Sequence, residues 1–295
     1  LTVHVTGVAV KLQGVRDVVA RVGEEFPRLD LRVACADDQQ GAAEGDEVRI
    51  PPARINPAGA PPPDRQSKDL LEHILHEDKK LLVINKPSGI AVHGGSGISL
   101  GIIEQLRLAR PDEKGLELVH RLDRATSGLL MVAKRRSALR MLHELQRDNR
   151  IRKRYLALVA GDWPHNRMTV DVPLRKNTLR GGERIVQADP EGKQALTLFR
   201  IKEQFSDSML VEAELKSGRT HQIRVHAAHL GTPVIGDDKY GDDEINRRYR
   251  ALGLKRLFLH AWTLAFEWGA EGRVLKLTAP LEPVLEQLLT TLRKH

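Results

Sequence analysis

A carboxylate flanked by two guanidinium groups is the part of this sequence best suited to chemistry. Residues 118–134 read LVHRLDRATSGLLMVAK, in which Asp123 stands between Arg121 and Arg124 and two apolar runs enclose the polar patch. A loop between two strands can present such an acid into a cleft, and nearby guanidinium charge favours the ionised form. The pattern predicts an acid available as a nucleophile or base, with a surface turn held by an ion pair as the alternative.

Residues 216–226, KSGRTHQIRVH, form a second segment rich in polar and basic groups. It opens with a Ser-Gly turn and is predicted to end as a strand. Alternate side chains of a strand point to opposite faces, so Gln222 and Arg224 would share one face and Ile223 and Val225 the other. If the apolar pair packs inward, the polar pair could face a cleft. A solvated edge strand is the alternative.

The composition favours a polyanionic partner. Over 295 residues the formal net charge is +8, and binding of phosphates by such an excess releases condensed counterions. Aromatic residues make up only 4%, so contacts to a nucleic acid would depend on arginine, lysine and shape rather than on an aromatic platform. No apolar run approaches the roughly 20 residues of a membrane span. We therefore expect a cytoplasmic protein that binds no membrane.

Neither a metal nor a cofactor is expected. The single Cys35 excludes an internal disulfide framework and a cysteine-based metal site. The sequence shows no phosphate-cradling glycine loop and no cluster of ligands at metal-site spacing. His120 and Asp123 could form a metal-binding pair, but too few co-ligands lie near them in the chain.

A proline-rich stretch divides the chain. Six prolines between positions 51 and 63 deny both helix and central strand, which predicts a linker at 53–69 between a small domain at 1–52 and a large one at 70–295. Helices are predicted after Ser99, after Ser137 and from Pro283. Strands are predicted at 80–84, 118–121, 129–133, 155–160, 197–201, 210–215, 223–226, 257–261 and 275–278. Strands without regular helix alternation indicate an α+β fold with a largely antiparallel sheet.

Taken in order, these motifs resemble the RluA-type family of pseudouridine synthases. The run from His120 to Asp123 with the following Thr-Ser-Gly is similar to the first family signature, and the run from Gly218 to His226 to the second. Other landmarks follow in family order: Asn85-Lys86-Pro87, Tyr155-Leu156-Ala157-Leu158, Gly236-Asp237 with Tyr240-Gly241, and Leu259-His260-Ala261. The stretches AVHGGSG at 91–97 and RSALR at 136–140 resemble the RluC branch, which acts on large-subunit ribosomal RNA.

The resemblance implies a mixed-sheet catalytic domain of the pseudouridine synthase type that flips a uridine out of folded RNA. Asp123 then corresponds to the catalytic carboxylate, Arg224 to the arginine paired with it, and Tyr155 to the tyrosine that stacks on the base. Arg121 corresponds to the residue that fills the vacated place in the RNA. No cofactor is implied, and we expect a monomer.

Further contacts to substrate or RNA are expected around these residues. Substrate contacts are expected from His120, Arg124, Lys86, Arg219, His221 and Gln222. Phosphate contacts are expected from Lys86, Arg124, Lys134, Arg135, Arg136, Arg152, Lys153 and Arg154. Residues 176–193 would form either an arm that grips RNA or a surface hairpin.

The N-terminal part departs from the family pattern. The resemblance implies an alpha-L domain, the small RNA-binding fold also found in ribosomal protein S-four, and residues 45–52 match its expected end. Residues 1–44 lack its basic helices. We therefore expect a divergent or incomplete alpha-L domain, or an imprecise reading frame.

Other functions stay open on the sequence. One is a non-catalytic RNA-binding or ribosome-assembly protein on the same fold, although the joint presence of Asp123, Arg224 and Tyr155 favours an enzyme. Another is a synthase acting on a different structured RNA such as tRNA. A metal-dependent nuclease would require clustered acidic ligands, which the sequence does not contain.

Overall fold

The computed structural model describes residues 2–5, 8–11, 69–94, 100–178, 184–269 and 272–294. The chain divides into two compact units, Leu1–Pro62 and Pro63–His295. In the first unit, β1 (Thr2–Val5) and β2 (Val8–Lys11) pair as an antiparallel hairpin. The rest of the expected alpha-L domain lies outside the described residues, so that assignment stays a prediction.

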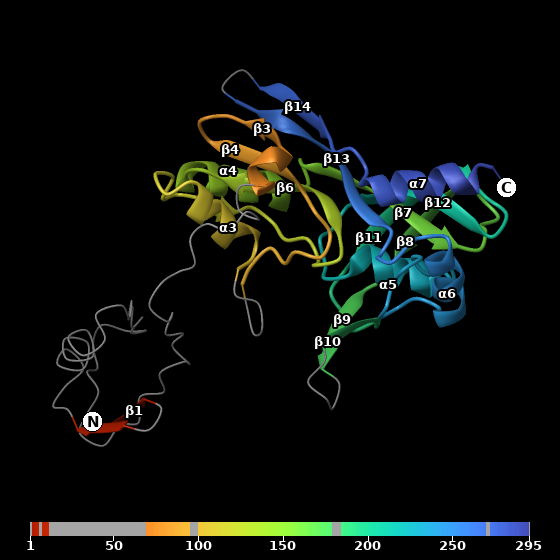
Figure 1. Cartoon of the computed structure of the whole chain (residues 1–295), viewed down its shortest axis with the longest axis horizontal. Coiled ribbons are helices and arrows are strands. Elements are labelled where there is room, and N and C mark those ends of the chain that lie inside the picture. The colour runs from red at the N-terminus through yellow and green to blue at the C-terminus, as the bar shows by residue number, and fades with distance from the viewer. Residues whose placement is uncertain are drawn as a thin grey trace. The chain divides into compact units, whose positions relative to one another are not determined.

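A large mixed sheet organises the second unit (Figure 1). Its strands follow the order β3 (Ile74–Glu77), β4 (Leu81–Lys86), β6 (Ser127–Ala133), β13 (Leu259–Trp268), β7 (Arg152–Ala160), β12 (Ser208–Leu215), β11 (Leu196–Gln204) and β8 (Arg167–Asp171). Two more strands join it, β5 (Glu117–Leu118) beside β6 and β14 (Arg273–Thr278) beside β13. Among the described strands of this sheet, β6 and β13 are the one pair that runs in parallel. The expected α+β fold with a largely antiparallel sheet is confirmed.

Helices precede, separate and follow these strands along the chain. They are η1 (Leu70–His73, a 3-10 helix), α3 (Ile102–Ala109), α4 (Arg136–Arg147), α5 (Gln222–His229), α6 (Asp243–Ala251) and α7 (Pro283–Leu292). The prediction that a helix begins at Pro283 is confirmed, because proline occupies the first turn of α7, where no N–H is needed. Among the described helices, none is both long enough and apolar enough to cross a membrane.

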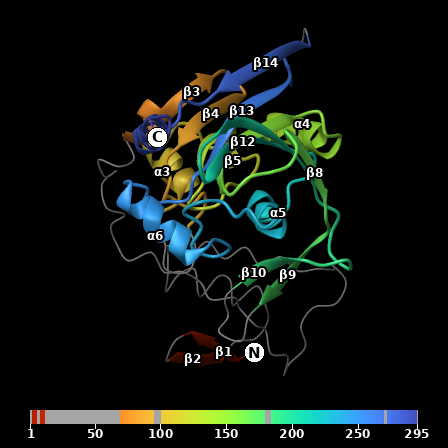
Figure 2. The same ribbon diagram turned by 90° about the vertical axis from the view of Figure 1, so that its right-hand side faces the viewer.

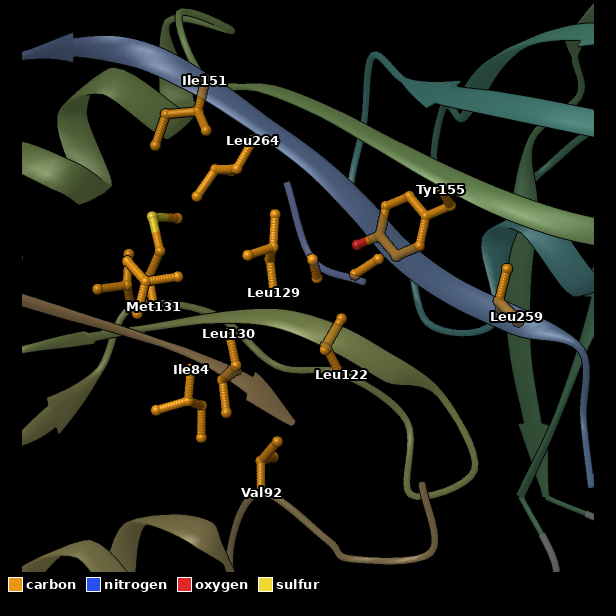
Figure 3. Close-up of a cluster of buried hydrophobic side chains, with 14 of the residues drawn as sticks. Ile84, Val92, Leu122, Leu129, Leu130, Met131, Ile151, Tyr155, Leu259 and Leu264 are labelled. Carbon is orange, nitrogen blue, oxygen red and sulfur yellow. The ribbon is translucent and has the colours of Figure 1, made fainter. Parts of the chain in front are cut away.

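Strand β7 separates two apolar clusters. Its odd positions from Tyr155 to Val159 belong to the larger cluster, which also contains residues of β4 and β6 (Figure 3). Its even positions from Leu156 to Ala160 pack with residues of α6 and α7 in the second cluster. This division follows from the alternation of side chains along a strand. Tyr155 therefore faces away from α6 and α7.

One predicted strand is a helix. The segment that ends at His226 was expected to be extended, but it forms the start of α5. The polar Gln222 and Arg224 have 2% and 6% exposure, so they are as buried as the apolar Ile223 and Val225, which have 4% and 5%. The prediction was wrong because it assigned the polar residues to an open face, whereas internal hydrogen bonds let a helix bury them on all sides.

A hairpin occupies much of the segment at 176–193. Strands β9 (Leu174–Thr178) and β10 (Arg184–Ala188) pair antiparallel and lie beside α5 (Figure 2). Val186 packs with Val225 of α5 in a small buried cluster. The described part of this segment is thus a hairpin and forms one side of the site described next, while its contact with RNA stays a prediction.

Candidate active site

Asp123 lies in the loop that joins β5 to β6. Its carbonyl oxygen accepts a hydrogen bond from the N–H of Thr126 at 3.1 Å, which closes a tight turn before β6 begins. Gly128 then adopts a φ of 107°, and a side chain there would meet the backbone oxygen of Ala261 on β13 at 2.3 Å. Glycine is required for both the positive φ and the close approach. The turn and this glycine together fix the position of the Asp123 loop relative to β6 and β13.

Lys86 holds this loop from inside the protein. Its Nζ donates to the carbonyl oxygens of Arg124 at 3.2 Å and of Pro87 and Ile90 at 2.8 Å. Lys86 has 0% exposure, and burial lowers its pKa to about 7. The prediction that Lys86 contacts RNA is therefore wrong, because all three of its N–H groups are used on backbone carbonyls.

Arg256 holds the next part of the loop. Its Nη2 donates to Ser127 Oγ at 3.0 Å and to the carbonyl oxygens of Leu259 at 3.2 Å and Ala125 at 3.4 Å. Its Nη1 pairs with Glu282. These bonds tie the residues around the start of β6 to the region before β13.

His260 completes this group of buried polar residues. Its Nδ1 lies 2.8 Å from Ser127 Oγ, and its Nε2 lies 3.3 Å from the carbonyl oxygen of Ala279. A carbonyl only accepts, so Nε2 carries the proton and Nδ1 accepts from the Ser127 hydroxyl. Burial is the main reason that the pKa of His260 falls to about 4, so the ring is neutral. We call Lys86, Ser127, Arg256 and His260 the loop anchor.

On the other side of Asp123, Arg224 of α5 connects two carboxylates. Its Nε and Nη2 each donate to Asp237 at 2.7 Å, and its Nη1 donates to Asp123 Oδ2 at 3.4 Å. The guanidinium also lies over the ring of Tyr240, 5.1 Å from the ring centroid. Such a bidentate pair fixes the guanidinium plane, which leaves one edge directed at Asp123. The expected pairing of Arg224 with Asp123 is present in the structure.

Asp237 is chemically suited to hold this arginine. Its side chain has 0% exposure, and it also accepts the N–H groups of Lys239 and Tyr240 at 2.9 and 3.0 Å. Burial raises the pKa of Asp237, but the hydrogen bonds and charge of Arg224 outweigh burial and lower it overall. The buried carboxylate is therefore ionised and fully bonded, and the guanidinium it holds stays charged.

His221 approaches Asp123 from the start of α5. It has a φ of 54°, and its Nε2 lies 3.8 Å from Asp123 Oδ1. Its Nδ1 lies 2.8 Å from the hydroxyl of Tyr240, which accepts the N–H of Val186 at 3.0 Å. The arrangement that satisfies every group has the tyrosine hydroxyl donating to Nδ1, which places the histidine proton on Nε2, facing Asp123. Burial is the main reason that the pKa of His221 is lowered.

Tyr155 of β7 lies at the end of the larger apolar cluster, beside Leu122 and Leu259 (Figure 3). The side chain is buried, with 7% of the residue exposed. Burial raises the pKa of its phenol, and the charge of Asp123 raises it further, so the hydroxyl stays protonated. The ring offers an apolar surface close to a carboxylate.

These residues line one cleft of about 460 Å³, a volume in the usual range for a small-ligand site. Eight of the predicted site residues line it: Asp123, Arg224, Tyr155, His120, Arg121, Arg219, His221 and Gln222. Thus the structure brings the two sequence signatures together although about a hundred residues separate them. Within the described ranges, no three His, Cys, Asp or Glu side chains gather closely enough to hold a metal ion.

Several predicted contact residues have other roles. Arg124 lies outside the cleft and donates through Nε to the carbonyl oxygen of Gly89 at 2.8 Å. The Gln222 amide accepts from Ser217 and from the N–H of Arg219, both at 2.9 Å, and donates to Leu196 and Thr197. Its hydrogen-bonding capacity is used inside the protein, so the RNA contact predicted for Gln222 is wrong. It holds the turn before α5 instead.

Other basic residues predicted to contact phosphates are already paired. Lys134 lies 2.6 Å from Glu77 and 2.9 Å from Glu113. Arg154 pairs with Glu214 at 2.9 Å and lies 3.6 Å from Glu212, while Arg152 is 3.9 Å from Glu214. Arg135 donates to a backbone carbonyl, and Arg136 is largely exposed. For Lys134 and Arg154, a phosphate would have to compete with carboxylates of this chain, and the predicted phosphate contacts stay a prediction.

Sequence reasoning missed the roles of Asp237 and Tyr240. Both residues had been noted only as landmarks in the motif Gly-Asp with Tyr-Gly. The available signal was an acid in a glycine turn shortly after the arginine of the second signature. Nothing in the sequence alone indicates that this acid, rather than Asp123, makes the closer pair with Arg224.

Comparison with known proteins places the chain in a family. A model of the RNA pseudouridylate synthase family matches residues 80–229. A protein of Pasteurella multocida named ribosomal large subunit pseudouridine synthase C is 51% identical over 253 residues, which cover 85% of this chain and 78% of that protein. The Escherichia coli K12 protein of the same name is 49% identical over 254 residues, covering 84% and 80%.

Solved structures agree with these sequence matches. Human RNA pseudouridylate synthase domain containing 4 superposes with a TM-score of 0.65 and 29% identity, covering 77% of this chain and 95% of that one. Human RNA pseudouridylate synthase domain containing 1 superposes with a TM-score of 0.60 and 27% sequence identity. The match covers 75% of this chain and 94% of that one. The signatures meet in one cleft, the fold is shared and the identity is near one half over most of the chain. This chain belongs to the RNA pseudouridylate synthase family.

Proposed function

We propose that this protein isomerises specific uridines to pseudouridine in large-subunit ribosomal RNA, with Asp123 as the catalytic carboxylate. The observation that carries the proposal is the position of Asp123 in the cleft, 3.4 Å from Arg224 and beside the buried Tyr155. The relatives that share about half of its sequence are named for large-subunit ribosomal pseudouridine synthesis, which supports the choice of RNA.

The reaction is an isomerisation, so its atoms balance within the substrate. The bond between N1 of uracil and C1′ of ribose breaks, the base turns, a bond forms between C5 and C1′, and the proton on C5 moves to the freed N1. Asp123 could attack the sugar, attack the base or remove a sugar proton, and each route begins from its ionised form. The Arg224 Nη1 lies 3.4 Å from one oxygen of this carboxylate and the His221 Nε2 lies 3.8 Å from the other, so both neighbours hold its orientation in the cleft.

Tyr155 supplies a surface for the base. Its ring lines the cleft, and burial keeps its phenol protonated. A uracil stacked on this ring would lie near Asp123, and the neutral hydroxyl could help to move the proton at C5. Arg219 is exposed at the same cleft, where it could contact the backbone of the RNA.

The uridine must leave its helix to reach Asp123. A cleft of about 460 Å³ is large enough for one nucleotide, whereas a duplex cannot enter it. Arg121 is exposed and lines the cleft two residues before Asp123. Its planar guanidinium can stack in the space that the flipped base leaves. This supports the role in RNA proposed for Arg121.

Asp123, Arg224 and Tyr155 meet in one cleft of a single chain. We propose that the protein acts as a monomer, and that it acts in the cytoplasm. We also propose that residues 1–52 form a divergent alpha-L domain that adds RNA affinity, joined by a linker at 53–69 to the catalytic domain at 70–295. Sedimentation of the purified protein tests the monomer.

Activity on defined RNAs tests the function. Wild-type protein and Asp123→Asn are incubated without added metal with transcripts of large-subunit RNA, small-subunit RNA and tRNA, and pseudouridine is measured. We expect product only from wild type on large-subunit RNA, with binding retained in Asp123→Asn. Product mainly on tRNA would favour a pseudouridine synthase that acts on tRNA. Binding without product from wild type would favour the non-catalytic RNA-binding protein.

A further inference from the structure

Lys153 shares one side of β7 with Tyr155. Its neighbours Arg152 and Arg154 point to the other side, where they meet Glu214. Because side chains alternate along a strand, Lys153 and Tyr155 both line the cleft. A Cβ at Gly218 in the turn before α5 would lie 4.0 Å from the ammonium. The Lys153 ammonium thus lies close to the turn before α5, in the cleft that Tyr155 also lines.

The ammonium of Lys153 has no carboxylate partner. Within the part of the chain that the structure describes, no Asp or Glu lies within 4.0 Å of it. Lys153 is half-buried, and burial lowers its pKa to about 8. A cation withdrawn from water without a counter-charge is costly, and an anion that enters the cleft would remove that cost.

The other buried cationic groups of the cleft are already satisfied. Arg224 is shared by Asp237 and Asp123. His120 accepts the N–H of Met131 through Nε2 at 3.2 Å. Burial, and then the charge of Lys153, lower the pKa of His120 to about 3, so His120 adds no positive charge. Among the buried basic groups that line the cleft, Lys153 is therefore the one whose positive charge has no carboxylate beside it in the described part of the chain.

A second polar group of the cleft also lacks a partner. Gln146, near the end of α4, lines the same cleft, and its Oε1 is buried with no hydrogen bond. The oxygen and nitrogen of an amide are interchangeable by rotation of the side chain, so Gln146 can present N–H groups to an anion. A bound anion can accept hydrogen bonds from the Lys153 ammonium and from an N–H of Gln146.

We propose that Lys153, assisted by Gln146, forms a phosphate-binding subsite that holds a backbone phosphate next to the flipped nucleotide. This inference rests on the proposed function, which brings RNA into the cleft. A nucleotide swung out of its helix carries one phosphate on each side, and these cross the rim of the pocket that receives the base. A compact ammonium binds a phosphate oxygen as a point charge.

The test combines protein variants with changes to single phosphates. Wild type, Lys153→Met, Lys153→Arg and Gln146→Leu are measured on a large-subunit RNA fragment that wild type modifies. The exposed Lys276→Met on β14 is the matched control. RNA affinity, its salt dependence and the single-turnover rate are recorded, and melting temperatures verify folding. Methylphosphonate then replaces each phosphate flanking the target in turn.

We expect Lys153→Met to weaken binding about tenfold and to reduce the salt slope by about one phosphate contact. Lys153→Arg should keep that slope, Gln146→Leu should cost about threefold, and Lys276→Met should behave as wild type. Methylphosphonate at one flanking position should weaken wild type but add nothing to Lys153→Met. Equal losses in both proteins at every position would overturn the subsite and leave the proposed function standing. An inactive wild type would overturn the proposed function itself.

Discussion

Two groups of buried cations flank the Asp123 loop and differ in how their hydrogen bonds are used. In the loop anchor, Lys86 and Arg256 direct their N–H groups at carbonyl oxygens, a hydroxyl and Glu282. On the cleft side, Arg224 turns one edge to Asp123, and Lys153 has no counter-charge among the described residues. A cation whose bonds are all used inside the protein supports the fold. One with capacity left over is available to a substrate.

Among the buried cations compared above, Arg224→Met should have the largest effect. This change removes the group that faces Asp123 and leaves Asp237 buried without its partner. We expect the single-turnover rate to fall by about a thousandfold, as for loss of a preorganised electrostatic contact, and the free energy of unfolding to fall by about 3 to 5 kcal/mol. Single-turnover assays and urea denaturation measure the two effects.

A second change separates these two consequences. In Arg224→Met/Asp237→Asn the buried negative charge is gone, while the side-chain oxygen can still accept from the N–H of Lys239. Stability should largely recover and activity should not. Recovery of activity together with stability would show that Arg224 acts only on the fold.

Lys86→Met should reduce the stability of the protein strongly and its catalytic rate only slightly. The change removes the donor to three carbonyl oxygens, of which that of Arg124 keeps the N–H of Gly89. The unsatisfied acceptors of Pro87 and Ile90 should lower the free energy of unfolding by about 2 to 4 kcal/mol. The rate constant of the molecules that remain folded should fall less than tenfold, because no group facing the substrate is removed. A thousandfold loss of rate with unchanged stability would place Lys86 among the substrate-facing cations and break the comparison.

The loop anchor should also make the protein sensitive to acid. His260 has its pKa lowered to about 4, chiefly by burial, against an ordinary value of 6.5. Between these values the unfolded chain binds a proton that the folded protein does not, so stability falls as the pH drops from about 6.5 to 4. One such group contributes about 3 kcal/mol over that interval.

His260→Gln tests that contribution. The variant should be less stable at pH 7, because the bond to Ser127 changes, but its stability should decline less steeply on acidification. His120 contributes to the same decline, since its pKa is lowered to about 3, so a shallower slope rather than a flat one is expected in urea denaturation. An unchanged slope would contradict the buried neutral His260.

Tyr240→Phe should have the smallest effect. The change removes the hydroxyl that bonds His221 Nδ1 and accepts from Val186. We expect a two- to fivefold lower kcat, roughly the effect of one hydrogen bond behind the site, with little change in KM. Nitrogen NMR of the His221 ring should show the Nε2–H form in wild type and a mixture in the variant. The same tautomer of His221 in both proteins would show that the Tyr240 hydroxyl does not set the position of the histidine proton.

Much of this arrangement could be predicted from the sequence because local patterns carry it. The polar loop between two apolar runs indicates an exposed acid at Asp123, and alternation indicates most strands of the sheet. The positions of Asp123, Arg224 and Tyr155 in one cleft were expected from the family resemblance. Their side chains lie on β7, α5 and the loop before β6, and only the complete sheet brings those elements together.

The errors concern burial of polar groups. Lys86 and Gln222 were expected at the RNA because long polar side chains are usually exposed. Both are buried, and each has partners both near it in sequence and in a distant segment, at Arg124 for Lys86 and at Leu196 and Thr197 for Gln222. Likewise, the pairs of Arg154 with Glu212 and Glu214 depend on the register of β7 against β12. A single sequence gives no access to those partners, so it cannot separate structural cations from substrate-facing ones.

The central claim is that Asp123 performs uridine isomerisation in large-subunit ribosomal RNA. The direct measurement maps pseudouridines in all ribosomal RNA and tRNA of a strain that lacks the gene, with and without plasmids that encode wild type or Asp123→Asn. We predict that particular pseudouridines disappear from large-subunit RNA alone, and that wild type restores them whereas Asp123→Asn does not. An unchanged map in the deletion strain, or restoration by Asp123→Asn, would contradict the claim.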